Sequence, residues 1–255
     1  MSGNSAILQP LLQEFSPISL TDIKAVELMD RVDVKFILHT NQLSLLLQEA
    51  KGNYEILQIG DNILNSEYHT VYYDTADCCM YYLHVKERAN RYKIRVREYV
   101  DSSTKFLEIK FKNNKGNTLK SRIKTENSMG CFNAEEADFI SSNSPFATQE
   151  LLPILSNRFK RITLANREWK ERITIDTYAE FSCQQSSISL GNLVVCEIKK
   201  NPGQHMTPME HLLRKMRIHP FRISKYILGS SLINSNVRPN LYKPKIILLN
   251  KKTLS

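Results

Sequence analysis

Hydrophobic and polar side chains alternate with a period of two along much of this chain. Because successive side chains of a strand point to opposite faces of a sheet, this alternation predicts β-strands. The strands are expected at residues 31–37, 68–73, 91–99, 106–112, 118–124, 171–177 and 193–199. Asp-Ser-Ser and Asn-Asn-Lys-Gly turns separate the three strands between residues 91 and 124, which predicts an antiparallel meander.

Other segments have the composition and end signals of helices. Helices are expected at residues 7–15, 22–29, 41–50, 134–141, 148–155, 208–216 and 224–233. The chain contains no internal repeat and no low-complexity linker, so we expect an α+β fold in a single domain over residues 1–255. Its core is expected over about residues 14–233, followed by a basic C-terminal tail at 234–255.

The predicted strands carry charged side chains on one face and apolar side chains on the other. Lys93, Arg95 and Arg97, for example, oppose Ile94 and Val96. The charged faces of the other strands hold Arg31, Asp33 and Lys35; Glu108, Lys110 and Lys112; Lys120, Arg122 and Lys124; Arg172 and Asp176; and Glu197 and Lys199. For one strand, a charged face in water is the simplest interpretation. Rows of like charge on neighbouring strands repel, however. Their repetition favours an antiparallel β-barrel with a charged cavity inside and peripheral helices over the apolar outer face.

The positive charge is concentrated in one segment. The 255 residues carry a formal net charge of +9, from 35 Lys and Arg against 26 Asp and Glu. Between Lys86 and Thr125 lie 13 of the basic and 4 of the acidic residues, so this segment accounts for the whole excess. Such a segment suits a polyanion, which could be nucleic acid, an anionic membrane or a polyanionic small molecule.

Missing motifs argue against several kinds of site. The five cysteines are odd in number and include no CxxC pair, which disfavours a zinc site or a disulfide framework and favours a reducing cytoplasm. The sequence has no glycine-rich phosphate loop and no HExxH motif. His39, His69 and His84 are interpreted as ordinary strand-end or surface residues. No apolar run approaches the ~18 residues of a transmembrane helix, and the N-terminus lacks a signal-peptide pattern.

Three carboxylates, Glu108, Asp176 and Glu197, lie among cations on the charged faces. Two interpretations are open at this point. The carboxylates form local salt bridges, or they belong to a site for Mg²⁺ or Mn²⁺, since such cations are held by a few carboxylates together with substrate phosphate oxygens.

Eight short motifs occur in a fixed order along the chain. They are Arg31–Phe36, Tyr73–Thr75, Arg95–Arg97, Glu108–Lys110, Ser121–Arg122, Arg172–Asp176, Glu197–Lys199 and Ser224–Tyr226. In this order they resemble the VTC domain, the catalytic domain of the vacuolar transporter chaperone polyphosphate polymerase, and above all its stand-alone bacterial members. That domain is one of the triphosphate tunnel metalloenzymes. The resemblance spans about residues 14–233.

The resemblance implies a fold, an activity and a set of site residues. The fold is an antiparallel β-barrel tunnel, and the activity is transfer of the γ-phosphate of ATP to a growing inorganic polyphosphate chain with Mn²⁺ or Mg²⁺. The residues implied as catalytic are Lys35, Arg95, Arg97, Lys110, Arg122 and Lys199. Further phosphate ligands would be Arg161, Arg172 and Lys225, with Lys93, Lys112, Lys120 and Arg222 as second-rank candidates. Glu197 is the first candidate metal ligand and Glu108 the second.

One departure from the broader superfamily concerns the first strand. Many members carry ExExK there, whereas this chain has Arg31 in place of the first acid and keeps Asp33 and Lys35. The variant resembles the VTC branch and disfavours a cyclase or a generic triphosphatase, which use the first-strand acids for metal binding. By analogy with bacterial members, a separate membrane protein is an expected partner, which would bring the enzyme to the inner face of a membrane.

The sequence alone leaves alternatives to the polymerase function open. A tripolyphosphatase or nucleoside triphosphatase would use the same tunnel, because hydrolysis and transfer differ only in the acceptor. A non-catalytic module could bind polyphosphate or RNA through residues 86–125. RNA is less favoured, because Phe106 lies at a strand edge and Phe111 on the apolar face. The tail could also reach a membrane surface through Arg238, Lys243, Lys245, Lys251 and Lys252.

Overall fold

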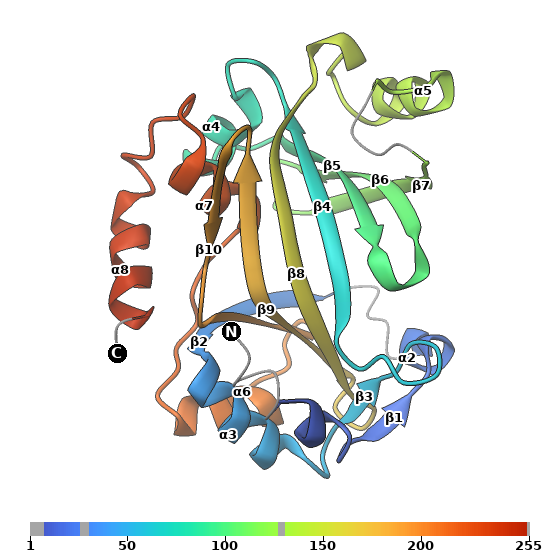
Figure 1. The fold of residues 1–255 in the computed structure, drawn as a ribbon, viewed down its shortest axis with the longest axis vertical. Helices are drawn as coiled ribbons and strands as arrows, with labels where there is room; N and C mark the ends of the chain where they lie inside the picture. Colours follow the sequence, from blue (N-terminus) through green and yellow to red (C-terminus); the bar gives the residue numbers. More distant parts are fainter. Residues whose placement is uncertain (1–7, 26–30, 127–130, 254–255) are drawn as a thin grey trace.

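The computed structural model describes residues 8–25, 31–126 and 131–253. Within these residues, eleven strands form one sheet, whose main path runs β2-β11-β9-β8-β4-β5-β6-β7 (Figure 1). These strands are β2 (Val32–His39), β4 (Ser66–Asp74), β5 (Arg91–Tyr99), β6 (Thr104–Lys112), β7 (Thr118–Lys124), β8 (Leu152–Asn166), β9 (Glu171–Cys183) and β11 (Leu193–Lys200). Every neighbouring pair along this path is antiparallel.

Three short strands extend the sheet. β10 (Ser186–Ser189) pairs with β9, and β3 (Glu55–Leu57) pairs with β8. β1 (Ser16–Ile18) pairs in parallel with β3.

The helices lie around the sheet rather than within it (Figure 1). They are α2 (Leu20–Ala25), α3 (Thr40–Ala50), α4 (Cys79–Val85), α5 (Ala134–Asn143), α6 (Pro208–Lys215), α7 (Lys225–Ile233) and α8 (Lys243–Thr253). Single 3₁₀ turns occur at Val100–Ser102 and Thr148–Glu150.

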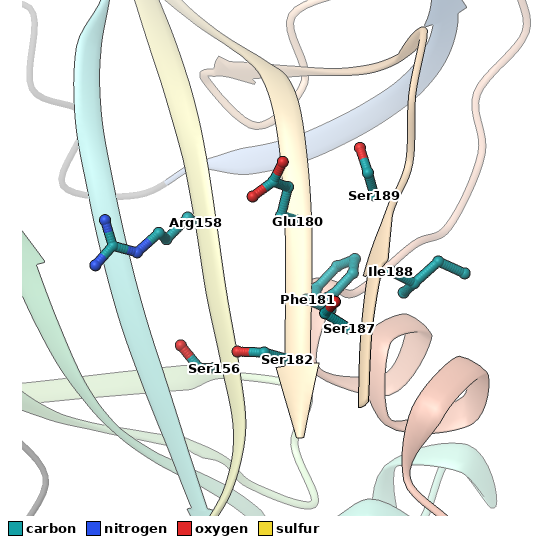
Figure 2. Close-up of a pocket in the computed structure, with 8 residues that line it drawn as sticks. All are labelled: Ser156, Arg158, Glu180, Phe181, Ser182, Ser187, Ile188 and Ser189. Atoms are coloured by element: carbon teal, nitrogen blue, oxygen red, sulfur yellow. The ribbon is translucent and has the colours of Figure 1, made fainter. Parts of the chain in front are cut away.

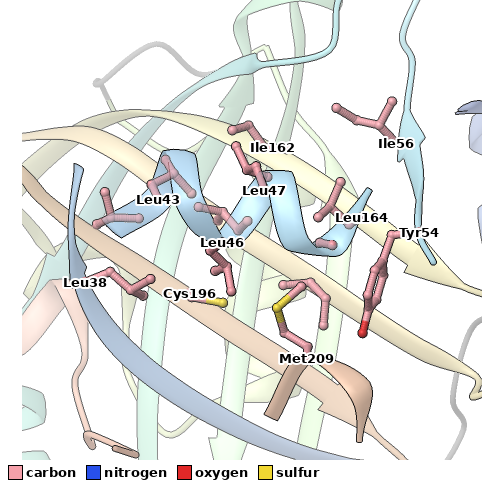
Figure 3. Packing of buried hydrophobic residues seen from close by; sticks show 14 of the residues in the cluster. Leu38, Leu43, Leu46, Leu47, Tyr54, Ile56, Ile162, Leu164, Cys196 and Met209 are labelled. Atoms are coloured by element: carbon pink, nitrogen blue, oxygen red, sulfur yellow. The ribbon is translucent and has the colours of Figure 1, made fainter. Parts of the chain in front are cut away.

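Helix α3 shows how the sequence places a helix on the apolar face of the sheet. Its buried leucines Leu43, Leu46 and Leu47 recur at helical spacing and therefore form one stripe. The stripe packs on Ile162 and Leu164 of β8 and on neighbouring apolar side chains (Figure 3). At the start of the helix, the His39 side chain accepts the backbone N–H of Asn41, and the Gln42 side chain accepts the N–H of His39, which completes a capping box.

Over much of the sheet the apolar faces of the strands point outward, under α3, α5 and α6, whereas α7 packs on the opposite side, against Leu155 and Phe181. Apolar side chains of β2, β8, β9 and β11 share one buried cluster with α3 and α6. Those of β4, β5 and β6 share a second cluster with Ile140 of α5. The charged faces therefore point the other way, which confirms the predicted α+β fold with an antiparallel sheet and peripheral helices.

Hydrogen bonds do not close this sheet into a full barrel, because β2 and β7 are its unpaired ends within the described residues. A loop bridges part of the gap instead. The N–H of Phe221 donates to the carbonyl of Lys35 on β2 at 2.7 Å. Three residues later, Ser224 Oγ accepts from Lys93 Nζ on β5 at 3.0 Å. The loop before α7 thus connects β2, one end of the curved sheet, to β5 in its other half.

One helix prediction was wrong and several elements were missed. Residues 148–155 were expected to be helical, but only Thr148–Glu150 form a turn, and β8 begins at Leu152. β8 pairs with β4 on one side and β9 on the other, and this pairing outweighs the local helix preference. β1, β3, β10, α4 and α8 were not predicted. Ile7 and residues 26–29 of the predicted N-terminal helices lie outside the described residues, as do residues 254–255 of the tail.

Candidate functional site

The strands β5, β6 and β7 carry matching rows of cations on their inner face, the face away from the covering helices. Lys93 on β5 is opposite Lys110 on β6, which is opposite Lys120 on β7. The next inner row holds Arg95, Glu108 and Arg122. We call β5–β7 the basic wall.

Glu108 is the carboxylate at the centre of the basic wall. Its carboxylate lies 2.6 Å from Arg95 Nη2 and 3.1 Å from Lys120 Nζ, and only 1% of its side chain is exposed. Although burial alone would raise the pKa of Glu108, Arg95, Arg97 and Lys120 hold it well below its usual range. Glu108 is therefore an anion that pairs with two cations.

The strands β8, β9, β11 and β2 form a second wall, whose cations have more carboxylate partners. Asp176 on β9 receives a bidentate pair from Arg161, with Nε at 2.6 Å and Nη2 at 2.8 Å, and also pairs with Lys225. The two cations hold the pKa of Asp176 well below its usual range despite its burial. We call β2, β8, β9 and β11 the balanced wall.

Close packing of α7 brings Lys225 to this position. Lys225 is the first residue of the helix, and Gly229 lies one turn further on. A Cβ at Gly229 would lie 2.4 Å from Phe181 Cδ1 of β9 and 2.8 Å from Leu155 Cδ2 of β8. Glycine therefore allows α7 to sit against these strands, and burial lowers the pKa of Lys225 to about 8.

Two recognised motifs meet behind this helix. The Asp74 carboxylate accepts the N–H groups of Met80 and Tyr81 at 2.9 and 2.8 Å, and also the hydroxyl of Tyr226. The buried aspartate thus joins the start of α4 to α7, beside Lys225. This contact explains why Tyr73–Thr75 and Ser224–Tyr226 belong to one pattern although they are far apart in sequence.

Glu197 and Lys199 occupy β11 of the balanced wall. Lys199 Nζ donates to Thr174 Oγ1 at 3.0 Å and lies 3.4 Å from Glu197 Oε2. Burial lowers the pKa of Lys199 to about 8. Lys199, Lys35, Arg161 and Lys225 hold the pKa of Glu197 well below its usual range, so Glu197 is an anion within a strongly positive region.

The two walls face each other across the interior. Burial and the positive charge of Lys35, on the balanced wall, lower the pKa of both Lys93 and Lys110, on the basic wall. Lys110 is nevertheless solvent-exposed, and 43% of the Lys120 side chain is exposed. Cations from opposite ends of the sheet therefore share one electrostatic environment.

Several cations of the basic wall have no carboxylate in direct contact in the described structure, although Glu108, Asp33 and Glu197 attract them from further away. Within residues 8–25, 31–126 and 131–253, no carboxylate lies within 4 Å of the charged nitrogens of Lys93, Arg97 or Lys110. Arg97 donates to Thr70 Oγ1 at 3.3 Å and is largely buried, and the neighbouring charge of Arg95 adds to burial in lowering its pKa. The guanidinium of Arg122 lies 4.8 Å from the ring centre of Phe106.

The remaining predicted ligands lie in the same region or at its edges. Arg172 is opposite Lys199, and Lys35 is opposite Glu197, in the register of the balanced wall. Lys112 is the last residue of β6, and Arg222 is exposed in the loop before α7. The sequence placed Asp176 with Glu108 and Glu197, as salt-bridging carboxylates or as part of a metal site, but did not identify its partners. Its position as a partner of Arg161 and Lys225 depends on tertiary contacts that no local pattern reveals.

Among the carboxylates, Glu197 fits a metal ion best. Its ion pair with Lys199 is long, at 3.4 Å, whereas Glu108 and Asp176 each pair closely with two cations. In the described part of the chain, no group of three or more His, Cys, Asp or Glu side chains gathers in one place. A divalent cation here would therefore take most of its oxygen ligands from substrate phosphates.

A separate cavity of about 190 Å³ lies on the opposite, outer face of β8, β9 and β10 (Figure 2). Ser156, Arg158, Glu180 and Ser182 line it, and Ser156 Oγ is 2.7 Å from Nε2 of His69. The other ring nitrogen of His69 lies 3.4 Å from Glu98. Ser156 is paired on both sides within β8, so its backbone amide belongs to the sheet and cannot form an oxyanion hole. We interpret this chain of side chains as structural.

Comparison with known proteins adds the family. The model of the VTC domain matches residues 30–234 of this chain. The chain belongs to the VTC domain family. The family that the eight motifs indicated is thus confirmed for this VTC domain protein. Membership of the family supports a function on polyphosphate or triphosphate substrates. No curated protein matches the chain.

Solved structures show that the fold is shared more widely. A candidate adenylate cyclase from Bacillus halodurans superposes with a TM-score of 0.50 and 12% identity, over 78% of this chain and 98% of that chain. A candidate adenylyl cyclase from Hippeastrum, described as having a dominant triphosphatase activity, gives a TM-score of 0.50 and 14% identity, over 80% of this chain and 96% of that chain. At this identity the likeness shows the fold alone.

Proposed function

We propose that this VTC domain protein is a polyphosphate polymerase that transfers the γ-phosphate of ATP to the end of an inorganic polyphosphate chain. The observation that carries the proposal is the basic wall, where Lys93, Arg97 and Lys110 have no carboxylate within 4 Å in the described structure. Uncompensated, partly desolvated cations repel one another and need an anion to neutralise them. A linear chain of phosphates provides repeated negative charge along the whole row.

The chemistry requires positioning and charge stabilisation more than a strong base. A terminal phosphate oxygen of the acceptor is already ionised, so it can attack the γ-phosphorus directly. The bond from that phosphorus to the β–γ bridging oxygen breaks, and ADP leaves with the electron pair. Arg95, Arg97 and Arg122 would hold phosphate oxygens through their planar guanidiniums, while Lys35, Lys110 and Lys199 would act as point charges along the path.

Glu197 is the residue that would hold Mn²⁺ or Mg²⁺, and Glu108 is the second candidate. A divalent cation bound there would supply positive charge to the phosphate oxygens in the transition state. Arg161 and Lys225 would keep the binding region positive, with Asp176 fixing both of them in place. ATP as donor agrees with the cytoplasmic location that the odd number and the spacing of the cysteines suggested, and export of the product by a separate membrane protein stays a prediction.

A tripolyphosphatase is the second candidate function. The Hippeastrum protein with the same fold is described as having a dominant triphosphatase activity, and water can replace the acceptor phosphate without any change in the cations. The two activities differ in their products rather than in their binding residues.

The experiment that tests the proposal is incubation of the purified protein with ATP and Mn²⁺, with and without a short polyphosphate primer. We expect ADP to form and the polyphosphate to lengthen, with one ADP released for each phosphate added to the chain. Orthophosphate without chain growth would replace the polymerase by the triphosphatase. Tight polyphosphate binding without either product would indicate a non-catalytic binding module. Arg158→Ala, an arginine of the outer face, is the matched control for each inner-face arginine.

A further inference from the structure

The C-terminal helix α8 exposes apolar side chains on the side that faces away from the protein. Tyr242 and Leu249 are buried in the cluster shared with α4 and α7, so one side of this segment already packs on the body of the protein. Leu241, Ile247 and Leu248 are 63%, 47% and 50% exposed. Figure 1 shows α8 at the periphery of the molecule.

The spacing along the helix puts Ile247 and Leu248 on one outward surface, and the exposed Leu241 lies just before the helix begins. At 100° per residue, Ile247, Leu248 and Lys251 fall within a single arc opposite Leu249. Lys243 lies beside this arc and is exposed as well. We call Leu241, Lys243, Ile247, Leu248 and Lys251 the α8 outer surface. It combines apolar side chains with cations.

Charge identifies what could cover this surface. Residues 234–255 contain Arg238, Lys243, Lys245, Lys251 and Lys252 and no Asp or Glu. Apolar side chains flanked by lysines, without carboxylates, fit the boundary between the headgroups and acyl chains of an anionic bilayer. With 11 residues, α8 is long enough to lie in that boundary, and no helix in the described parts of the chain is long and apolar enough to cross it.

We propose that the α8 outer surface docks this protein on an anionic lipid bilayer, with Ile247 and Leu248 entering the headgroup region and Lys243 and Lys251 contacting lipid phosphates. This binding goes beyond the proposed polymerase and does not depend on it. The basic wall lies on the inner face of the sheet, on other elements, so a substrate and a bilayer can be bound together.

The test measures co-sedimentation of the full chain with vesicles. Vesicles of phosphatidylcholine alone are compared with vesicles containing 30% phosphatidylglycerol, in the presence of excess tripolyphosphate to occupy the inner face. We expect binding to the anionic vesicles only, and a strong decrease in high salt. Lys243→Gln with Lys251→Gln should weaken partitioning by about 25-fold, since each lysine near such a surface contributes about fivefold.

A matched pair of substitutions distinguishes vesicle binding through α8 from non-specific binding by any exposed leucine. Leu248→Asn should lower partitioning severalfold, whereas Leu45→Asn on α3, where the leucine is equally 50% exposed, should leave it unchanged. Both variants should keep the melting temperature and the ATP-dependent activity of the wild type. No binding to anionic vesicles, or equal binding by the Leu248→Asn and wild-type proteins, would overturn the proposal. Activity measured in the same samples reports separately on the polymerase.

Discussion

The basic wall and the balanced wall of the sheet both carry buried cations, but they differ in how many carboxylates pair with those cations. On the basic wall, Glu108 is the inner-face carboxylate among rows of Lys and Arg, and Lys93, Arg97 and Lys110 have no carboxylate within 4 Å in the described structure. On the balanced wall, Asp176 and Glu197 accompany Arg161, Lys199 and Lys225. The number of cations on a wall therefore says less about its role than whether a carboxylate lies beside each of them. Cations that pair with a carboxylate hold their positions without a bound ligand. Cations without such a partner need a bound anion to neutralise them.

The largest effect is expected on the balanced wall, from Asp176→Asn. This change leaves Arg161 and Lys225 buried with no ion-pair partner at their centre, which should cost about 3–5 kcal/mol of unfolding free energy. Chemical denaturation measures the loss. The control is Glu55→Gln, which breaks the bidentate but exposed pair with Arg167 and should cost less than about 1 kcal/mol. Equal losses in the two variants would show that burial of the Asp176 pair is unimportant.

The second effect concerns the basic wall, through Arg97→Ala. Loss of a guanidinium aimed at transferred phosphate should lower the rate of polyphosphate synthesis about 100-fold. Stability should change only modestly, because Arg97 has no carboxylate within 4 Å, and its removal loses a longer-range attraction to Glu108 but relieves repulsion from Arg95. Rate and melting temperature are measured together, beside Arg158→Ala on the outer face. A wild-type rate for Arg97→Ala would contradict the assignment of the inner face as the site.

A smaller effect is expected for Glu197→Gln on the balanced wall. The amide keeps the shape but removes the charge that a divalent cation needs, so the Mn²⁺ concentration for half-maximal activity should rise at least tenfold. Glu180→Gln, on the outer face of β9, is the control. If both variants gave the wild-type metal titration, Glu197 would not be the metal ligand.

The sequence could predict most of the strands and their charged faces, but not the tertiary contacts between them. Strict alternation identified the charged faces of β2, β5, β6, β7, β9 and β11, because a period of two leaves no choice of face. β8 was partly misread as a helix, since Leu151, Leu152 and Leu155 also suit helical spacing, and its pairing with β4 and β9 is invisible locally. For the same reason, the sequence could not join Asp176 to Lys225, 49 positions away.

The smallest expected effect is on pH dependence. Lys199 and Lys225 have pKa values of about 8 in the free protein, so both lose charge between pH 7 and pH 9. Bound phosphate favours the protonated lysines, so binding takes up protons and affinity falls as pH rises, by up to about tenfold for each lysine. Calorimetric titration at both pH values tests this, and Lys225→Arg should flatten the profile because arginine stays charged. A profile as steep as that of the wild type would exclude Lys225 as a contributor.

The central claim is that the cations of the inner face, and not the positive charge of the chain as a whole, bind the phosphate chain. Calorimetric titration of tripolyphosphate into Lys110→Ala and Lys105→Ala tests it most directly. Both lysines lie on β6 and both variants lose one positive charge, but Lys105 is opposite Glu98, in a row on the other face of the sheet. We expect at least tenfold weaker binding for Lys110→Ala and unchanged binding for Lys105→Ala. Equal weakening in both variants would contradict it.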